Sequence, residues 1–230
     1  MWPFTRKQSI LSSGALQGFC DCHSHLLPGV DDGIQTIEDT LTALSQYERW
    51  GIGEVWLTPH VMEDEPNTTD ALRERFGELQ KQYSGPLQLR LMSENMLDNL
   101  FVERLAKDDF LPYGNEGKEL LVETSCMQPP MDLLRLLQNI AEHGLKPVLA
   151  HPERYLYMDT SYYRQLSRMG VRFQMNITSL TGFYGQEVRD RARLLHEEGL
   201  YTYYGTDCHS LDSLAKSLSE STLPSSSKLF

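Results

Sequence analysis

The sequence has no apolar run long enough to cross a membrane and no excess of basic residues. A transmembrane helix needs about 20 consecutive apolar residues, and no stretch of the 230-residue chain approaches that length, so we expect no membrane insertion. The formal net charge is −11, which argues against a nucleic-acid partner because binding to that polyanion depends on Lys and Arg. A local basic pocket for one phosphate group remains compatible with this charge.

Cysteine is scarce, and its spacing excludes a cysteine-dependent phosphatase mechanism. The chain has four cysteines and no C-x-x-C pair: Cys20, Cys22, Cys126 and Cys208. The N-terminal segment lacks a continuous apolar stretch and makes a poor signal peptide, so we expect a cytoplasmic protein with reduced cysteines. Cysteine-dependent phosphatases carry an arginine six positions after the nucleophile. The residues at those positions here are Leu26, Pro28, Asp132 and Leu214, which excludes that mechanism.

The chain also lacks internal repeats, dividing linkers and a Gly-rich dinucleotide or phosphate loop. Short apolar runs instead alternate with helical patterns. The predicted strands are residues 18–22, 54–57, 87–92, 119–123, 147–150, 171–175 and 201–204. Helical patterns lie between and after them at residues 36–44, 71–79, 100–105, 133–141, 162–166 and 188–195.

Seven strand-then-helix units imply an α/β protein with a parallel sheet whose faces are covered by helices. Either a closed barrel or an open doubly wound sheet fits the pattern, and the missing Gly-rich loop favours the barrel. We expect one domain over residues 18–220, an N-terminal arm at 1–17 and a Ser-rich disordered tail at 221–230. In such barrels the reactive residues lie at the carboxyl ends of the strands.

The stretch DCHSHLLPGVDDG combines two histidines with two aspartates at the end of the first predicted strand. Residues i and i+2 of a strand point to the same face, so His23 and His25 can address one point in space. Asp31 and Asp32 follow on a loop that contains Gly. One H-x-H is a weak signal by itself, because chance and core packing account for most such pairs.

Every later strand also ends in a polar or metal-capable side chain. In chain order these are His60, Glu94, Glu123, His151 with Arg154, Asn176, and Asp207 with His209. The remaining histidines, His143 and His196, lie in helical patterns, where a helix terminus and a solvated face explain them. Each member alone has an ordinary structural explanation. Together, several buried carboxylates would repel one another unless cations neutralised them, and mixed imidazole and carboxylate ligands suit Mn, Fe or Zn.

Six segments carry a resemblance to a known family. HSHLLPGVDDG, LTPH, LVETS, VLAHPERY, FQMNITSLTGFYG and GTDCHS resemble the PHP superfamily and, within it, the bacterial capsule and exopolysaccharide tyrosine phosphatases of the CpsB/CapC group. The resemblance runs in order from about residue 20 to residue 209, and LLPGVDDG and AHPERY are its most specific parts. It implies a distorted seven-stranded, TIM-like (β/α)7 barrel, the PHP fold.

The resemblance also implies up to three divalent ions, with Mn²⁺ expected and Fe, Zn or Mg as alternatives. Their ligands would be His23, His25 and Asp207 at the first ion, Glu94 between the first and second, Glu123 and His151 at the second, and Asp32, His60 and His209 at the third. Arg154 would grip the phosphate and act in catalysis with Asp207 and His209, and Asn176 would contact the substrate. Asp31 is expected to shape the turn rather than bind metal, so Asp32→Ala should reduce activity further than Asp31→Ala.

The implied activity is hydrolysis of phosphotyrosine on a protein, with the tail of a bacterial tyrosine kinase that controls polysaccharide synthesis as the partner. Two features depart from the family pattern. The first Glu lies in Ser93-Glu94-Asn95 rather than A-E-Y, and no arginine follows Arg193 where the family commonly has one after the final D-x-H. Two alternatives stay open: another PHP phosphoesterase, acting on histidinol phosphate or a nucleotide, and a non-catalytic metal-binding module.

Overall fold

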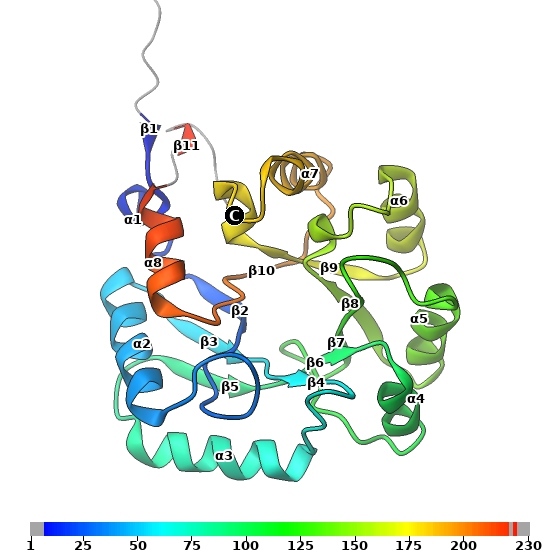
Figure 1. The fold of residues 1–230 in the computed structure, drawn as a ribbon, viewed down its shortest axis with the longest axis horizontal. Coiled ribbons are helices and arrows are strands. Elements are labelled where there is room, and N and C mark those ends of the chain that lie inside the picture. The colour runs from blue at the N-terminus through cyan, green and yellow to red at the C-terminus, as the bar shows by residue number, and fades with distance from the viewer. Residues whose placement is uncertain (1–6, 221–222, 225–230) are drawn as a thin grey trace, which may run out of the picture.

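The computed structural model describes residues 7–220 and 223–224, and its parallel strands lie inside an arc of helices (Figure 1). The strands are β1 (Lys7–Gln8), β2 (Cys20–Ser24), β3 (Glu54–Leu57), β4 (His60–Val61), β5 (Gln88–Leu91), β6 (Glu94–Met96), β7 (Glu119–Glu123), β8 (Lys146–Ala150), β9 (Arg172–Asn176), β10 (Tyr203–Gly205) and β11 (Leu223–Pro224). The helices are α1 (Ile10–Ser13), α2 (Ile37–Trp50), α3 (Thr69–Gln82), α4 (Asn99–Leu105), α5 (Leu133–Glu142), α6 (Thr160–Arg168), α7 (Gln186–Glu197) and α8 (Leu211–Glu220), with 3₁₀ turns η1 (Pro152–Arg154) and η2 (Ile177–Thr181). Within this described part of the chain, no helix has the length and apolar character that a membrane span requires.

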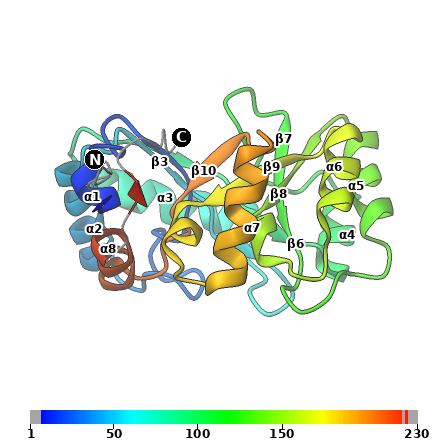
Figure 2. The ribbon, with the colours of Figure 1, turned by 90° about the horizontal axis from the view of Figure 1, so that it is seen from above.

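Two parallel sheets form the centre of the molecule. One has the strand order β10-β9-β8-β7-β6-β4 and the other the order β2-β3-β5, and every neighbouring pair in them is parallel. Seen from above, α1, α2 and α8 lie together at one end and α4, α5 and α6 at the other (Figure 2). The predicted α/β class with parallel strands is confirmed, in the form of a curled sheet with helices on its outer side.

Two of the predicted strands are each followed, after a short interruption, by a further strand that the sequence did not predict. Residues 54–57 form β3, but Thr58 and Pro59 separate it from β4, because proline has no N–H to donate to a ladder. The second interruption lies between β5 and β6, and the amide of Glu94 there donates to the carbonyl of Pro59 at 3.1 Å. The register of β4 and β6 pairs His60 with Glu94, so these short strands bring two predicted ligands side by side.

The carboxyl end of β2 is joined to the segment after β10. The amide of Asp207 donates to the carbonyl of His23 at 2.8 Å, and the amide of His25 donates to the carbonyl of Cys208 at 3.1 Å. The register of β2 with β3 shifts between Asp21 and Ser24, and such irregularities re-aim side chains next to functional sites. Strands β2 and β10 each begin two residues later than the sequence predicts.

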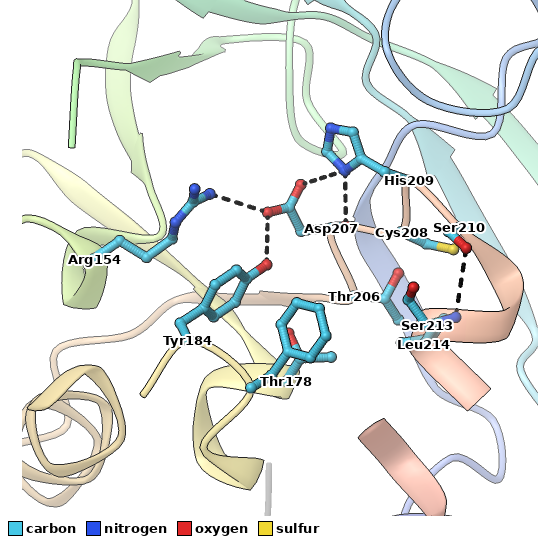
Figure 3. A pocket seen from close by; sticks show the side chains of 11 residues that line it. Arg154, Thr178, Tyr184, Thr206, Asp207, Cys208, His209, Ser210, Ser213 and Leu214 are labelled. Carbon is cyan, nitrogen blue, oxygen red and sulfur yellow. Dashed lines mark hydrogen bonds and ion pairs between the residues drawn. The ribbon is translucent and has the colours of Figure 1, made fainter. Parts of the chain in front are cut away.

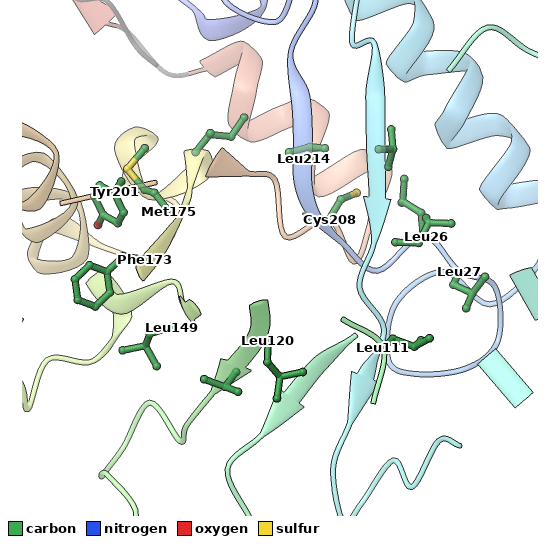
Figure 4. Packing of buried hydrophobic residues seen from close by; sticks show 14 of the residues in the cluster. Leu26, Leu27, Leu111, Leu120, Leu149, Phe173, Met175, Tyr201, Cys208 and Leu214 are labelled. Atoms are coloured by element: carbon green, nitrogen blue, oxygen red, sulfur yellow. The ribbon is translucent and has the colours of Figure 1, made fainter. Parts of the chain in front are cut away.

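The hydrophobic core has two parts, which follow from the alternation of side chains along each strand. The larger part lies between the strands and the helices; Figure 4 shows Leu26, Leu120 and Leu149 among its members. The smaller part lies on the opposite face of the strands, and we call it the interior cluster: Cys22, Trp56, Met92, Tyr113, Leu121, Val148 and Ala150. Trp56 and Tyr113 meet edge to face there, with ring centroids 4.9 Å apart.

The ends of the chain lie partly within the described residues. In the predicted N-terminal arm, Ile10 of α1 is fully buried, and β1 pairs antiparallel with β11. Of the predicted disordered tail, only residues 223–224 are described, and the rest lies outside the described residues. The predicted helix start at Thr36 agrees with a local cap, because the Thr36 side chain accepts a hydrogen bond from the Asp39 amide ahead of α2.

Candidate metal centre

All nine predicted metal ligands meet at the carboxyl ends of the parallel strands. They form four overlapping groups, and in each group one possible ligand atom per residue lies within 4.8 Å of the others. The groups are His23, His25 and Asp207; His23, Glu94 and His151; His60, Glu94 and Glu123; and His25, Asp32, His60 and His209. The strand ends therefore assemble one continuous cluster of imidazoles and carboxylates.

The Nε2 atoms of His23 and His25 face each other, and each has a lone pair in the neutral ring. Nδ1 of His23 contacts the amide oxygen of Gln174 at 2.8 Å, and Nδ1 of His25 contacts a carboxylate oxygen of Asp31 at 2.8 Å. Each of these acceptors requires an N–H at Nδ1, which leaves Nε2 of a neutral ring as an acceptor. The two Nε2 atoms are only 3.1 Å apart. A metal ion held by both nitrogens fits this arrangement, with the second ring nitrogen of each histidine oriented by a partner.

The carboxylate of Glu94 lies at the centre of the cluster. Its Oε2 atom is 3.2 Å from Nε2 of His23, 3.4 Å from Nε2 of His25 and 3.1 Å from Nδ1 of His60. Among the described residues this buried oxygen has no hydrogen-bond partner, and neither have Oε1 of Glu123 and Nδ1 of His60. Buried polar atoms are nearly always paired, so three unpaired ones at one point are the pattern expected of metal ligands.

The electrostatics of the cluster favour added positive charge. Burial by itself lowers the pKa of His60, and His25 lowers it further, but Glu94 and Glu123 raise the pKa of His60 to about 10. Burial raises the pKa of Glu94, yet the charges of His23 and His60 hold this pKa well below its usual range. Glu94 thus stays ionised in a buried site and favours nearby cations, whether protons on imidazole or metal ions.

The adjacent aspartates occupy different positions. Asp31 is buried, and besides contacting His25 its carboxylate accepts the backbone N–H groups of His60 and Gly33, each at 3.0 Å. Asp32 is 68% exposed, with Oδ1 3.1 Å from Nε2 of His209. Gly33 allows the loop to turn here, because a Cβ at this position would lie 2.2 Å from the carbonyl oxygen of His25. Asp31 therefore orients a predicted ligand, while Asp32 is itself within reach of one.

Asp207 connects the cluster to the predicted phosphate-binding arginine (Figure 3). Its Oδ2 atom accepts from Nδ2 of Asn176 at 2.6 Å, from Arg154 at 3.3 Å and from the Tyr184 hydroxyl at 3.2 Å. Burial lowers the pKa of Arg154, but the charge of Asp207 more than offsets this and raises it overall. Asn176 is fully buried and its amide is used by Asp207, so its predicted contact with substrate stays a prediction.

A cavity of about 230 Å³ opens beside this group of residues. Arg154, Asp207 and His209 line it, together with Phe183, Tyr184, Leu214, Cys208, Thr178, Thr206, Ser210 and Ser213. Burial raises the pKa of the Cys208 thiol to about 12, so the thiolate that a cysteine nucleophile needs is not formed at neutral pH. This agrees with the exclusion of a cysteine-dependent mechanism from the spacing in the sequence.

Sequence reasoning missed two residues of the site. Gln174 orients His23 and lies two positions before Asn176 in β9, so the same-face rule for strands could have found it. Tyr184 follows η2 on a turn, where no periodicity points to it. The two histidines left out of the predicted site lie elsewhere: Nδ1 of His143 contacts the carbonyl of Asn139 at 2.8 Å, and His196 contacts the Tyr204 hydroxyl at 3.4 Å.

This fold and this cluster define a class: parallel α/β proteins that gather histidines and carboxylates able to hold metal ions at the carboxyl ends of their strands. A sequence model of the family "Capsular polysaccharide synthesis, CpsB/CapC" matches residues 19–227. The chain belongs to this family, and the resemblance inferred from its motifs is confirmed.

Named relatives and solved structures agree with this assignment. The chain is 28% identical over 211 residues to the tyrosine-protein phosphatase CpsB of Streptococcus agalactiae, covering 84% of this chain and 83% of the relative. It is 28% identical over 200 residues to the tyrosine-protein phosphatase YwqE of Bacillus subtilis, covering 83% and 77% of the two chains. Its fold is similar to a structure from a study of YwqE from B. subtilis and CpsB from Streptococcus pneumoniae, described as metal-dependent tyrosine phosphatases, with a TM-score of 0.77, 27% identity, and coverage of 85% of this chain and 81% of that one.

Proposed function

We propose that this protein is a metal-dependent protein tyrosine phosphatase. The observation that carries the proposal is the pair of facing Nε2 atoms of His23 and His25, which converge on Glu94 and Asp207 beside a cavity that contains Arg154. That arrangement combines a site for divalent ions with a cation for phosphate. Membership of a family whose named relatives are tyrosine-protein phosphatases supports the same activity.

The reaction is hydrolysis of the bond between phosphorus and the tyrosyl oxygen, which yields tyrosine and inorganic phosphate. Divalent ions in such a site supply Lewis acidity toward the phosphate oxygens and lower the pKa of water. Arg154 binds phosphate oxygens through its planar guanidinium group, and Asp207 and the Tyr184 ring hold that group in place. The phenolate is a good leaving group, since the reference pKa of tyrosine is about 10.

The ligand assignment follows the resemblance. We propose three ions. The first would be bound by His23, His25 and Asp207, the second by Glu123 and His151, and Glu94 would be shared by these two ions. The third would be bound by Asp32, His60 and His209. The donor set of imidazole and carboxylate suits Mn²⁺, with Fe, Zn or Mg as alternatives. The four groups of close ligand atoms support this division, and Asp31 lies outside it.

The finer features of fold and setting are also proposals. We propose that the two parallel sheets are parts of one distorted seven-stranded barrel within a single domain at residues 18–220. The hydrogen bonds of Asp207 with His23 and of Cys208 with His25 support this, because they link β2 to the segment after β10. We propose further that the protein acts in the cytoplasm on the phosphorylated tail of a tyrosine kinase that controls capsule or exopolysaccharide synthesis.

A metal-depletion experiment tests the activity. The full-length protein is treated with excess chelator, metal loss is verified by elemental analysis, and turnover of a phosphotyrosyl peptide is measured before and after Mn²⁺ is added back. We expect activity to disappear and return. Full activity in the metal-free protein would contradict the proposal. Faster turnover of histidinol phosphate or a nucleotide than of the peptide would favour a different phosphoesterase, and absence of all turnover with metal bound would favour a non-catalytic module.

A further inference from the structure

The cavity beside the metal centre is lined by both charged and aromatic residues. Arg154, Asp207 and His209 supply guanidinium, carboxylate and imidazole groups, and Phe183, Tyr184 and Leu214 supply aromatic and aliphatic surface among smaller side chains. Its volume of about 230 Å³ lies below the range of about 300–1,000 Å³ typical of sites for drug-sized ligands. A single side chain suits this space better than a larger group does.

Tyr184 is fully used by the protein itself. The guanidinium carbon of Arg154 lies 4.8 Å from the centre of its ring, and its hydroxyl donates to Asp207. Its ring also meets the Phe183 ring edge to face, with centroids 4.9 Å apart at 86°. Tyr184 thereby fixes Arg154 on one side and Phe183 on the other.

Phe183, in contrast, is 54% exposed although it lines the cavity. It lies on a short turn between Gly182 and Gly185, whose φ angles of +87° and +97° are values that side-chain-bearing residues rarely adopt. Phe183 and Ser213 also line a neighbouring cavity, so the ring stands where the site opens. An aromatic ring held at this position is available for contact with a ligand.

We propose that Phe183, supported by Tyr184, receives the aromatic ring of the substrate and selects aryl phosphates over alkyl phosphates. The inference rests on the proposed function and adds the residue that recognises the leaving group. Charge and shape complement such a ligand from end to end: Arg154 meets the phosphate, and an apolar aromatic surface meets the ring. Aromatic pairs gain stability beyond the apolar area they bury, whereas a phosphoserine side chain offers no ring to Phe183.

Binding of two phosphonates to the Mn²⁺-loaded, full-length protein tests this proposal. Phenylphosphonate carries a ring, methylphosphonate does not, and calorimetric titration measures each Kd without turnover. We expect the wild type to bind phenylphosphonate more tightly. Phe183→Ala should weaken phenylphosphonate about tenfold, the scale of losing one aromatic contact, and leave methylphosphonate unchanged. The same variant should reduce kcat/KM for a phosphotyrosyl peptide by a similar factor.

Matched variants separate loss of the ring from loss of the fold. Phe183→Tyr keeps a ring and should behave as the wild type, and Phe183→Leu keeps an apolar side chain and should show the selective loss if Phe183→Ala does not fold. Leu194→Ala removes another exposed apolar side chain, 41% exposed on α7, and should change neither Kd. Equal weakening of both phosphonates, or of neither, would overturn the proposal. Absence of peptide turnover by the wild type would instead count against the proposed function, while the titrations would still report on Phe183.

Discussion

Two parts of the same parallel strands are built in opposite ways: the interior cluster, and the carboxyl ends that carry the predicted ligands. In the interior cluster, Trp56 packs against Tyr113, and the polar groups beside it are paired, as where Trp56 donates to Glu54 at 2.8 Å and Arg90 pairs with Glu54 at 2.6 Å. At the carboxyl ends, Oε2 of Glu94, Oε1 of Glu123 and Nδ1 of His60 are buried without a hydrogen-bond partner among the described residues. Strand β7 includes both kinds of position, with Leu121 in the interior cluster and Glu123 among the predicted ligands.

This difference separates stability from function within the same set of strands. A well-packed apolar cluster stabilises the fold without any ligand. Unpaired buried charges destabilise a fold unless a cation compensates them, so their presence at the carboxyl ends marks where the ligand binds. Changes in the interior cluster should therefore alter stability, and changes at the carboxyl ends should alter activity.

The largest effect is expected in the interior cluster, from Trp56→Ala. Trp56 is 1% exposed, and truncating a buried aromatic side chain to Ala costs about 3–5 kcal/mol in the free energy of unfolding. We expect a loss of that size in urea denaturation, with kcat of the folded protein unchanged at low temperature. Trp56→Phe, which keeps a ring, should lose less. A fall in kcat without a change in stability would contradict the comparison.

At the carboxyl end, Asp207→Ala should act mainly on catalysis. Its carboxylate contacts the imidazoles of His23 and His25 and the guanidinium of Arg154. We expect kcat/KM on a phosphotyrosyl peptide to fall by about 10²–10³-fold, the scale of losing one electrostatic group from an active site. Elemental analysis should also show less bound metal. Asp212→Ala removes an exposed carboxylate nearby and serves as the control; equal turnover of both variants would refute the assignment of Asp207.

The adjacent aspartates give a finer test at the same end. Asp31→Ala leaves Nδ1 of His25 without its partner, and losses of about 10–100-fold in metal affinity or activity are typical when a residue that orients a ligand is removed. We expect this loss in metal titrations followed by activity. The sequence-based expectation that Asp32→Ala reduces activity further than Asp31→Ala stays a prediction. Because Asp31 makes several buried contacts, we expect a smaller difference in activity between the two variants. Wild-type metal affinity in Asp31→Ala would show that His25 needs no such support.

The smallest effect concerns Asp21, a buried carboxylate of β2 whose oxygens accept several hydrogen bonds. Its oxygens accept from the amide and hydroxyl of Thr206, each at 2.7 Å, while burial raises the pKa of Asp21 from 3.8 to about 6. The fold therefore favours the protonated form, and the stability from Asp21 is present below about pH 4 and is lost as the pH rises through 6.

Asp21→Asn removes this titration. Relative to the variant, the wild type should lose roughly 1–2 kcal/mol in the free energy of unfolding between about pH 4 and 6. Urea denaturation at several pH values in the presence of chelator measures the difference. Asp70→Asn, which changes a 97% exposed side chain, should run parallel to the wild type. A constant gap between wild type and Asp21→Asn at all pH values would show that Asp21 stays ionised.

Much of the fold and many of the candidate site residues could be predicted from the sequence, because the signals that reveal them are local. Strand alternation depends on neighbouring residues, so 54–57 and 119–123 agree with β3 and β7 to the residue. Polar residues at strand ends also stand out locally, which is why the sequence could single out the nine side chains that the structure brings together. The breaks that separate β4 and β6 from the strands before them were not predicted, since they depend on how Pro59 contacts the neighbouring strand.

Sequence alone predicted which polar side chains gather at the strand ends, because each lies where an apolar strand pattern stops and a polar side chain follows. Only the tertiary structure decided how those side chains divide their roles. Gln174 holds His23 from a distance of 151 residues, Tyr184 positions Arg154, and Asp31 rather than Asp32 orients His25. These relations depend on hydrogen-bond directions across strands far apart in the chain, and no periodicity within one segment records the direction in which another segment points.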